Sequence, residues 1–259
     1  MSRFFFIGDL HGDVMPLIHL HRQKELTQDD WVILLGDSGL NYWINKPDRM
    51  ATMKQQFANL PCKIFVIRGN HEERAETMEA IYPDEWEVLI LDNEIFGLVR
   101  RELKYPNIFY ALDMPWVYRI NDYSTLVMPG AYSVDKYYRL KCKYNWFNSE
   151  QLTEEEKVTG KNLALFSNHY DFILSHTCPI EYEPTDLFLP MIDQTTVDKS
   201  MELYLSEINQ LTNSNFWLFG HYHANRVYPL RQGEGQKIML FQKALEMDNI
   251  LKGNYWEMI

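Results

Sequence analysis

The sequence predicts an α/β fold with parallel strand pairing. Two observations predict it: short apolar runs recur along the chain, and helical patterns separate them. An apolar run of this length, bounded by polar residues, is typical of a strand that is buried on both faces. Because strand–helix–strand alternation requires a crossover, neighbouring strands are expected to run parallel. The five runs are residues 4–7, 32–35, 64–67, 172–174 and 216–219.

The segments between these runs carry helical signatures. Residues 16–26 follow Asp13, which suits a helix N-cap, and residues 47–60 begin with a proline, which fits the first helical turn. In the second half of the chain, Ser149 suits the cap of a Glu-rich helix, and residues 197–211 form another helical pattern before the last apolar run. The alternation therefore extends through both halves of the chain.

Three further segments complete the assignment. Residues 125–128 predict a sixth strand, which leads into a polar loop at residues 131–143. Two stretches at residues 226–230 and 237–241 predict a β-hairpin that closes the sheet. Residues 82–121 contain aromatic residues and prolines without clear periodicity, so only irregular strands and loops are expected there.

The composition is that of an ordinary globular protein, with 46% hydrophobic and 24% charged residues. No shift in composition marks a boundary, so a single domain over residues 1–259 is expected. The formal charge of −11 disfavours non-specific nucleic-acid binding, although bound divalent cations would add positive charge locally. The first apolar run is too short for a signal peptide or a membrane span, so we expect a cytoplasmic protein without membrane contact. The sequence predicts no oligomeric state.

Each of the five buried runs ends at a polar cluster that contains histidine, aspartate or asparagine. Ligands bind outside the carboxyl ends of the strands in open α/β sheets, so these side chains are expected to converge. Polar side chains buried there cost free energy unless something satisfies them, which favours a functional role. In chain order, the clusters are GDLHGD, GDSG, RGNHEER, SHTCP and GHYH.

Two pairs of candidate ligands share one spacing. Asp9 and His11 are two residues apart at a strand end, and His221 and His223 repeat that spacing. Side chains two residues apart in an extended chain point in the same direction, so each pair could grip one ion. Gly220 precedes the second pair and would allow the backbone to approach the site closely.

Three further residues extend this set. Asp37 follows a buried run and could bridge two cations through its two oxygens, while Asn70 offers an amide oxygen and His176 an imidazole. A mixed set of nitrogen and oxygen donors suits manganese, iron or zinc, whereas calcium and magnesium prefer oxygen alone. The donor types leave manganese, iron and zinc open, and our overall expectation is two divalent metal ions, with manganese favoured and iron, zinc or nickel as alternatives.

Taken in order, these clusters resemble the motifs of the calcineurin-like metallophosphoesterase family: GD-x-H, GD, GNHE, a lone histidine after an apolar strand, and GH-x-H. They span residues 8–223. The resemblance implies a four-layer αββα sandwich, in which helices flank two mixed sheets. GDLHG and RGNHE are most similar to the branch with the Ser/Thr protein phosphatases and diadenosine tetraphosphatases. That branch continues its second motif as GD-x-V-D-R-G, whereas this chain has GDSGLNYW, which is closer to bacterial and phage members.

The resemblance also implies roles for individual residues. Two divalent ions would bind the phosphoryl oxygens and lower the pKa of a shared water, which attacks phosphorus in line. His71 takes the role of the non-ligand histidine near the leaving-group oxygen, and Asp37 that of the bridging ligand. The implied ligand sets are Asp9, His11 and His223 for one ion, and Asn70, His176 and His221 for the other.

The divergent second motif lacks the family's phosphate-binding arginine and the aspartate that orients the catalytic histidine. Arg139, after the predicted sixth strand, is our candidate for the missing arginine, because a guanidinium can hold phosphate oxygens bidentately. Arg139 and Asn70 are thus the candidate substrate-binding residues, and His71 and Asp37 the candidate catalytic ones. The alternative for the Arg139 loop is a solvated basic segment with aromatic residues packed beneath it.

Other polar residues in these motifs have simpler explanations. Asp13 and Glu72 suit helix N-termini, where carboxylates accept hydrogen bonds from free amides. Arg68 could reach a phosphate, but a strand-end arginine is expected to pair with a carboxylate. Tyr42 and Trp43 could form a lip over the cleft or anchor a loop.

The motifs and the resemblance together predict a dinuclear, metal-dependent phosphoester hydrolase that uses a metal-activated water. A phosphomonoesterase acting on phosphoproteins or small phosphorylated metabolites is favoured. A phosphodiesterase or nuclease on the same centre is the first alternative, and a binding protein that has lost catalysis is the second. Substrate choice depends on residues 82–121 and on the loops near residues 135 and 180.

Overall fold

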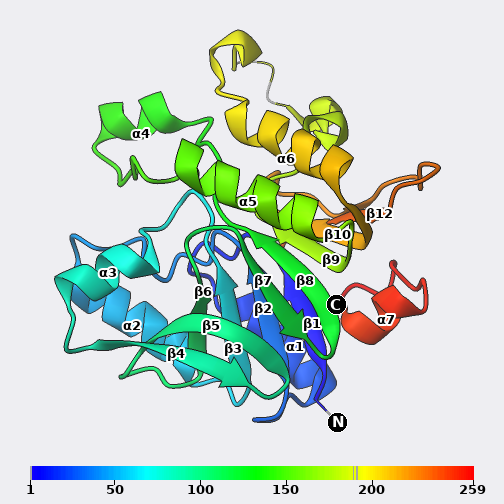
Figure 1. Ribbon diagram of the computed structural model, residues 1–259. Coiled ribbons are helices and arrows are strands. Elements are labelled where there is room, and N and C mark those ends of the chain that lie inside the picture. Colours follow the sequence, from blue (N-terminus) through cyan, green and yellow to red (C-terminus); the bar gives the residue numbers. More distant parts are fainter. Residues whose placement is uncertain (1, 189, 191) are drawn as a thin grey trace.

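The computed structural model describes residues 2–188, 190 and 192–259 and has an α/β fold, as the sequence predicts (Figure 1). No helix in the described part of the chain is long and apolar enough to cross a membrane. The strands are β1 (Phe4–Ile7), β2 (Trp31–Leu35), β3 (Lys63–Ile67), β4 (Trp86–Asp92), β5 (Ile95–Glu102), β6 (Ile108–Ala111), β7 (Trp116–Ile120), β8 (Tyr123–Met128), β9 (His169–Ser175), β10 (Asn213–Phe219), β11 (Arg226–Val227), β12 (Gln236–Met239) and β13 (Leu245–Glu246). The helices are α1 (Met15–Lys24), α2 (Pro47–Ala58), α3 (Ala75–Ile81), α4 (Lys136–Cys142), α5 (Glu154–Phe166), α6 (Ser200–Leu211), α7 (Met247–Leu251) and the 3₁₀ turns η1 (Ile180–Tyr182), η2 (Thr185–Leu187) and η3 (Gln194–Thr196).

The strands form two halves. The first has the order β13-β1-β2-β3-β6-β5, with β4 paired to β5, and the second has the order β7-β8-β9-β10-β12-β11. Strands β1, β2, β3 and β6 run parallel in the first half, as do β8, β9, β10 and β12 in the second. Antiparallel strands lie at the margins of both halves. Each half is therefore mixed, with a parallel centre.

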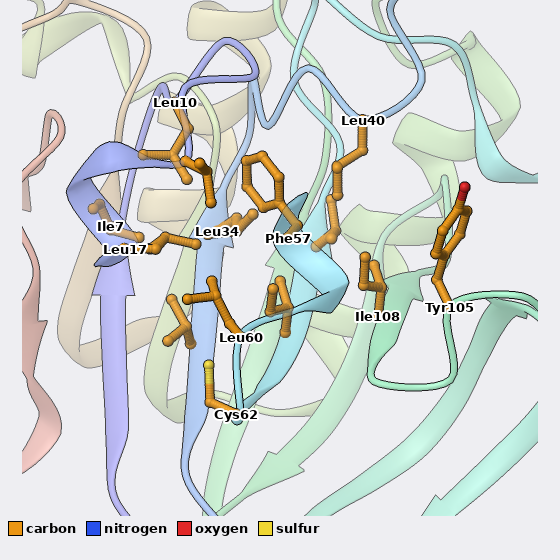
Figure 2. Close-up of a cluster of buried hydrophobic side chains, with 14 of the residues drawn as sticks. Ile7, Leu10, Leu17, Leu34, Leu40, Phe57, Leu60, Cys62, Tyr105 and Ile108 are labelled. Atoms are coloured by element: carbon orange, nitrogen blue, oxygen red, sulfur yellow. The ribbon is translucent and has the colours of Figure 1, made fainter. Parts of the chain in front are cut away.

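An outer hydrophobic cluster packs α1 and α2 against the first half. Successive side chains of a strand point to opposite faces, so β1 directs Phe5 and Ile7 toward these helices. Figure 2 shows Ile7 beside Leu17 of α1, and Phe57 of α2 near Leu34 of β2. Burying one such side chain contributes roughly 1.5–3 kcal/mol, so these contacts fix the two helices behind the strands that lead to the site.

A central cluster lies between the two halves. Strand β1 contributes Phe4 and Phe6, β9 contributes Phe172, and the rings of Phe6 and Phe172 stack with their centroids 5.9 Å apart. A third cluster packs α5 and α6 against the outer face of the second half through residues such as Ala164 and Leu205. The order helix, sheet, sheet, helix gives the predicted four layers.

The two halves are also joined along one margin. Strand β5 pairs with β7, which places Ile95 opposite Ile120 and Phe96 opposite Arg119. Hydrogen bonds therefore run without a break through all thirteen strands. The two predicted sheets are two halves of one strand network, folded over the central cluster.

Residues 82–121, expected to form irregular strands and loops, contain the four regular strands β4 to β7. Strands β4 and β5 form an antiparallel hairpin. On β4, Val88 and Ile90 are 45% and 64% exposed, so its outward face is apolar. The alternation of polar and apolar residues that marks a half-buried strand is therefore missing from this segment, which is why the sequence did not predict it.

Two other segments also differ from the sequence prediction. Helix α5 begins after Thr153 rather than Ser149: Thr153 accepts the backbone N–H of Glu156, and the Glu156 carboxylate accepts the N–H of Thr153. This reciprocal arrangement is a capping box. The predicted loop at residues 131–143 contains helix α4. Asp13, predicted as the N-cap of the first helix, lies one residue before the N-cap Val14, and its carboxylate accepts the N–H of the first helical residue at 2.9 Å.

Candidate metal centre

The seven predicted ligands lie on loops that follow strands of both halves. Because parallel strands end at the same margin of a sheet, their following loops meet there. Strand by strand, the residues are Asp9 and His11 after β1, Asp37 after β2, Asn70 after β3, His176 after β9, and His221 and His223 after β10. The two halves of the strand network therefore contribute to one site.

Five of these residues adopt a left-handed backbone conformation. Their φ angles are 56° at Asp9, 47° at His11, 48° at Asp37, 73° at His221 and 52° at His223. Residues other than glycine rarely adopt this conformation, and where they do the strain is concentrated at functional sites. The extended-chain geometry expected for the two pairs is therefore wrong. The pairs converge through tight turns beyond the strand ends.

Glycines beside the ligands allow the backbone to approach the side chains closely. A Cβ atom on Gly36 would lie 2.1 Å from Nδ1 of His176, and one on Gly220 would lie 2.4 Å from Oδ2 of Asp9. Both distances are far shorter than a van der Waals contact, so any side chain at these positions would displace a ligand. The close approach predicted at Gly220 is confirmed.

The first group of donor atoms comes from Asp9, His11 and His223. Nε2 of His11 lies 2.9 Å from Nε2 of His223, which in turn lies 3.8 Å from Oδ1 of Asp9. Two ligand atoms that are each about 2.1 Å from one ion, at right angles, are about 3 Å apart. The two imidazole nitrogens have this separation, so the group could hold a metal ion.

A second group forms around the buried Asp37. Its Oδ1 lies 3.4 Å from Nε2 of His176, whereas its Oδ2 lies 3.8 Å from Nε2 of His11. Oδ1 of Asn70 is 2.9 Å from the same nitrogen of His176. Because the two oxygens of Asp37 face different histidines, its carboxylate lies between two sets of donor atoms.

His221 lies beside the second group rather than within it. Its ring centroid is 5.0 Å from that of His176, and its backbone N–H donates to the Asp9 carboxylate at 2.9 Å. Among the described residues, the close groups of histidine and aspartate donor atoms include His71 but not His221. The structure thus brings the His221 backbone into the site and leaves its ring at the edge.

Burial sets the charges of several side chains in the site. It raises the pKa of Asp9 to about 8 and lowers the pKa of His11 to about 4. Burial also lowers the pKa of His221 and of His223. These three imidazoles are therefore neutral near pH 7, which is the form that binds metal ions.

Asp37 and His176 form a charged pair. Burial opposes both charges, but the nearby His71 and His176 outweigh it and hold the pKa of Asp37 well below its usual value. Burial likewise opposes the charge on His176, but Asp37 outweighs it and raises the pKa of His176 to about 9. A divalent cation would take the place of the His176 proton, so the donor set of imidazoles, carboxylates and one amide fits such an ion.

Glu72 ties two ligand loops together, a role that the sequence analysis missed. Its buried carboxylate accepts hydrogen bonds from the backbone of Gly39 at 3.2 Å and of Gly69 at 3.0 Å, and from the hydroxyl of Ser38. It does not cap a helix, as the sequence suggested, because Asp113 accepts a backbone N–H in the first turn of α3. The loops after β2 and β3 are therefore pinned to one carboxylate.

A second buried network supports Asn70. Its Nδ2 donates to the hydroxyl of Ser133 at 2.8 Å, and that hydroxyl donates to the Glu150 carboxylate at 2.5 Å. Arg68 pairs with Asp113 at 3.2 Å, as expected of a strand-end arginine. No sequence motif indicates Ser133 or Glu150, because their role depends on contacts between segments that are far apart in the chain.

His71 and Arg139 meet at the edge of the donor groups. Nδ1 of His71 lies 3.3 Å from Oδ2 of Asp37 and 3.2 Å from Nη2 of Arg139. The Nε atom of Arg139 donates to both oxygens of Asp135 at 2.8 Å, and its Nη1 donates to the hydroxyl of Tyr42 at 3.2 Å. These contacts hold the guanidinium beside His71. The segment predicted to supply an arginine therefore reaches the site.

One solved structure with a TM-score above 0.5 shares this fold at low sequence identity, and two further structures are similar at lower scores. The first matches over 95% of both chains, with a TM-score of 0.52 and 12% identity. The protein TT1561 of Thermus thermophilus matches over 94% of this chain and 93% of its own, with a TM-score of 0.47 and 11% identity. The phosphopantetheinyl hydrolase PptH from Mycobacterium tuberculosis matches over 93% and 89%, with a TM-score of 0.44 and 13% identity. Such identities speak for the fold alone.

No curated protein matches the sequence. In contrast, residues 2–225 match the family described as calcineurin-like phosphoesterases. This span includes all seven predicted ligands as well as His71 and Arg139. The chain therefore belongs to the calcineurin-like phosphoesterase family and is a metal-dependent hydrolase of phosphoesters.

Proposed function

We propose that this hydrolase is a phosphomonoesterase that binds two divalent cations, with manganese favoured. The observation that carries the proposal is the position of Arg139, whose Nη2 lies 3.2 Å from Nδ1 of His71 at the edge of the donor groups. A phosphomonoester carries up to two negative charges, so a guanidinium in addition to the metal ions favours it over a singly charged diester. Phosphoproteins and small phosphorylated metabolites are the expected substrates.

The two groups of donor atoms support a dinuclear centre. Asp37 lies between the groups and presents a different oxygen to each, which suits a bridging ligand. His221 joins the second set because its backbone N–H donates to Asp9 and its ring centroid lies 5.0 Å from that of His176. The proposed ligands are Asp9, His11 and His223 for one ion, Asn70, His176 and His221 for the other, and Asp37 for both.

Bound divalent cations supply positive charge to the phosphoryl oxygens and lower the pKa of a water molecule toward neutrality. The side chains around them orient the substrate and move protons. Arg139 can donate to a phosphoryl oxygen through Nη2, since Asp135 and Tyr42 hold its other nitrogens in place. His71 can hold a proton for the leaving-group oxygen, a role that typically contributes about 10²- to 10⁴-fold to the rate.

The first test compares hydrolysis of p-nitrophenyl phosphate and of bis(p-nitrophenyl) phosphate with added manganese. We expect the protein to prefer the monoester. Asp37→Asn should lower this activity by at least about a hundredfold, because it removes the charge between the two donor groups. Asp122→Asn makes the same change at a position whose side chain is 92% exposed, and it should retain the activity.

Each other outcome has a definite meaning. Preference for the diester would replace the monoesterase with a phosphodiesterase or nuclease on the same centre. Manganese binding without hydrolysis of either compound would indicate a binding protein that has lost catalysis. Equal activity in the wild type and Asp37→Asn would contradict the proposed centre and place the chemistry elsewhere.

A further inference from the structure

Two segments that are distant in the sequence meet beside the metal centre. Nδ2 of Asn145 donates to the carbonyl of Tyr42 at 2.6 Å, and Nδ2 of Asn45 donates to Oδ1 of Asn145 at 3.0 Å. We call residues 42–49 and 134–146 the rim. The second of these segments contains the arginine that contacts the catalytic histidine, so whatever binds the rim lies next to the site of chemistry.

The rim is basic, although the protein is acidic. It carries six lysines and arginines against two aspartates, a net charge of +4, whereas the whole chain carries −11. Among the described residues, five of the six rim cations have no carboxylate oxygen within 4.0 Å. Cations without carboxylate partners leave a positive potential that attracts anions. These five are Lys46, Arg49, Lys136, Lys141 and Lys143.

The rim also exposes aromatic side chains. Tyr137, Tyr138 and Tyr144 are 68%, 59% and 55% exposed. Every residue of α4 is exposed or half-buried, and Figure 1 shows this helix standing out from the body of the protein at the upper left. In the other rim segment, the Arg49 guanidinium lies 3.5 Å from the centroid of the Trp43 ring. Aromatic rings and cations are thus interspersed along both rim segments.

We propose that the rim binds single-stranded nucleic acid and that, beyond the phosphomonoesters proposed above, the hydrolase acts on a phosphate at the end of such a strand. Proteins that bind single strands without sequence preference combine aromatic rings, on which bases stack, with cations that contact the phosphates. An acidic peptide would satisfy the charges of the rim, but only nucleic-acid bases would also stack on its exposed aromatic rings. The overall charge of −11 does not decide this question, because the rim itself is positive.

The part of this inference that concerns the substrate rests on the proposed phosphomonoesterase, whereas the binding itself does not. Helix α4 has seven residues and is therefore about 10 Å long. Stacked bases are separated by about 3.4 Å along a nucleic-acid strand, so this helix can accompany about three nucleotides. A short strand with a terminal phosphate would suffice as substrate.

Fluorescence anisotropy with a labelled, 5′-phosphorylated oligothymidylate of about ten nucleotides tests the inference. We expect Lys141→Glu/Lys143→Glu to weaken binding at least about tenfold. The slope of log affinity against log salt should fall by about 1.4, because each phosphate contact of a single strand contributes about 0.7. Tyr138→Ala/Tyr144→Ala should weaken binding about tenfold through the loss of stacking. In hydrolysis, the ratio of kcat/KM for the oligonucleotide to that for p-nitrophenyl phosphate should fall by a similar factor.

Arg119→Glu/Lys252→Glu is the matched control, because it makes the same change of charge at exposed positions outside the rim. It should bind the oligonucleotide within about twofold of the wild type. If the wild type fails to bind the oligonucleotide at low salt, or if the two rim variants bind as tightly as the control, the inference is wrong. Rim-dependent binding of an acidic phosphopeptide in place of the oligonucleotide would also overturn it, in favour of a protein partner.

Asp37→Asn separates this inference from the proposed function, since it removes the proposed bridging ligand and keeps the rim intact. Suppose that this variant binds the oligonucleotide through the rim and that the wild type hydrolyses no phosphomonoester. This result would support nucleic-acid binding by the rim and contradict the proposed phosphomonoesterase. Hydrolysis of p-nitrophenyl phosphate by a wild type that does not bind the oligonucleotide would support the phosphomonoesterase and contradict nucleic-acid binding by the rim.

Discussion

The ligand loops and the rim lie side by side, yet they are built in opposite ways. In the ligand loops, the carboxylates of Asp9, Asp37 and Glu72 are buried, and backbone hydrogen bonds such as that from His11 N–H to the Asp37 carbonyl, at 2.7 Å, connect one loop to the next. In the rim, every residue of α4 is exposed or half-buried. This difference in burial matches two different tasks, chemistry in the ligand loops and recognition at the rim. Chemistry requires donors held in a fixed arrangement, whereas recognition of a flexible partner tolerates a solvent-exposed surface.

The largest effect is expected where the ligand loops are pinned. Glu72→Ala would leave the backbone N–H groups of Gly39 and Gly69 without acceptors, so it should lower the free energy of unfolding by at least about 3 kcal/mol. Manganese affinity should fall about 10- to 100-fold, because the loops after β2 and β3 lose their shared support. Urea unfolding and isothermal titration calorimetry measure the two effects. Glu155→Ala, on the exposed face of α5, should change neither. Normal manganese affinity in Glu72→Ala would show that the loops after β2 and β3 keep their conformation without this carboxylate.

The second prediction concerns a buried charge behind the ligand loops. The hydroxyl of Thr177, the residue after a proposed ligand, donates to Glu202 at 2.7 Å, and burial raises the pKa of Glu202 to about 7. Below the usual pKa of 4.5 this carboxyl is neutral in both the folded and the unfolded state. Between pH 4.5 and 7 the carboxyl ionises in the unfolded state while burial keeps it protonated in the folded state, so stability falls by about 3 kcal/mol and levels off above pH 7.

Glu202→Gln should therefore be more stable than the wild type at pH 8, and the difference should shrink at pH 5. Thermal unfolding at the two pH values measures this. Glu207→Gln, on the same helix with its side chain 54% exposed, should show no such dependence on pH. A constant difference between Glu202→Gln and the wild type would mean that Glu202 stays charged, or stays neutral, throughout this range.

The third prediction tests the residue that connects the two regions. Arg139→Lys should raise KM for a phosphomonoester about tenfold and leave the bound manganese in place, because an ammonium cannot keep the paired contacts to Asp135 and Tyr42 while reaching the phosphate. Steady-state kinetics and metal analysis provide the measurement, with Arg119→Lys as the control. Unchanged kinetics would remove Arg139 from the site and leave the solvated basic segment as the better interpretation.

The smallest effect is expected on the outer surface of the rim. Tyr137→Ala removes a side chain that is 68% exposed, so the free energy of unfolding should change by no more than about 0.5 kcal/mol. Phe57→Ala, at a fully buried position in the outer cluster, should cost about 3–5 kcal/mol in the same urea titration. A large loss of stability in Tyr137→Ala would contradict the contrast between buried ligand loops and an exposed rim, because it would show that α4 contributes to the packing of the fold.

The strands that lead to the metal centre could be predicted because they are buried on both faces. Strand β1 has the predicted bounds, and β2 and β3 each begin one residue earlier than predicted. A continuous apolar run that ends in polar residues predicts both a buried strand and the position of the candidate metal ligands that follow it. The positions of Asp37 and Asn70 follow from this, since each comes two or three residues after the end of such a run.

Features that depend on contacts across the fold could not be predicted in this way. Glu72 looks like a helix cap in the sequence, and only the approach of the loop after β2 shows that it binds two loops. The four regular strands in residues 82–121 were not predicted, because Val88 and Ile90 place apolar side chains on an exposed face. The left-handed turns at Asp9 and His11 are only weakly marked by residue type, because aspartate and histidine adopt this conformation more often than most residues but still rarely.

The two groups of donor atoms proposed to hold metal ions each draw on both halves of the strand network: Asp9 and His11 meet His223, and Asp37 meets His176. A cation bound to either group therefore acts as a reversible cross-link between the halves. By mass action, an ion present at a thousandfold excess over its dissociation constant adds about 4 kcal/mol to the stability of the folded state. A chain in which one half has opened loses three or four of its seven proposed ligands and releases the ion. Metal occupancy would thus report complete folding, and depletion of the metal would expose the protein to unfolding before any effect on catalysis is counted.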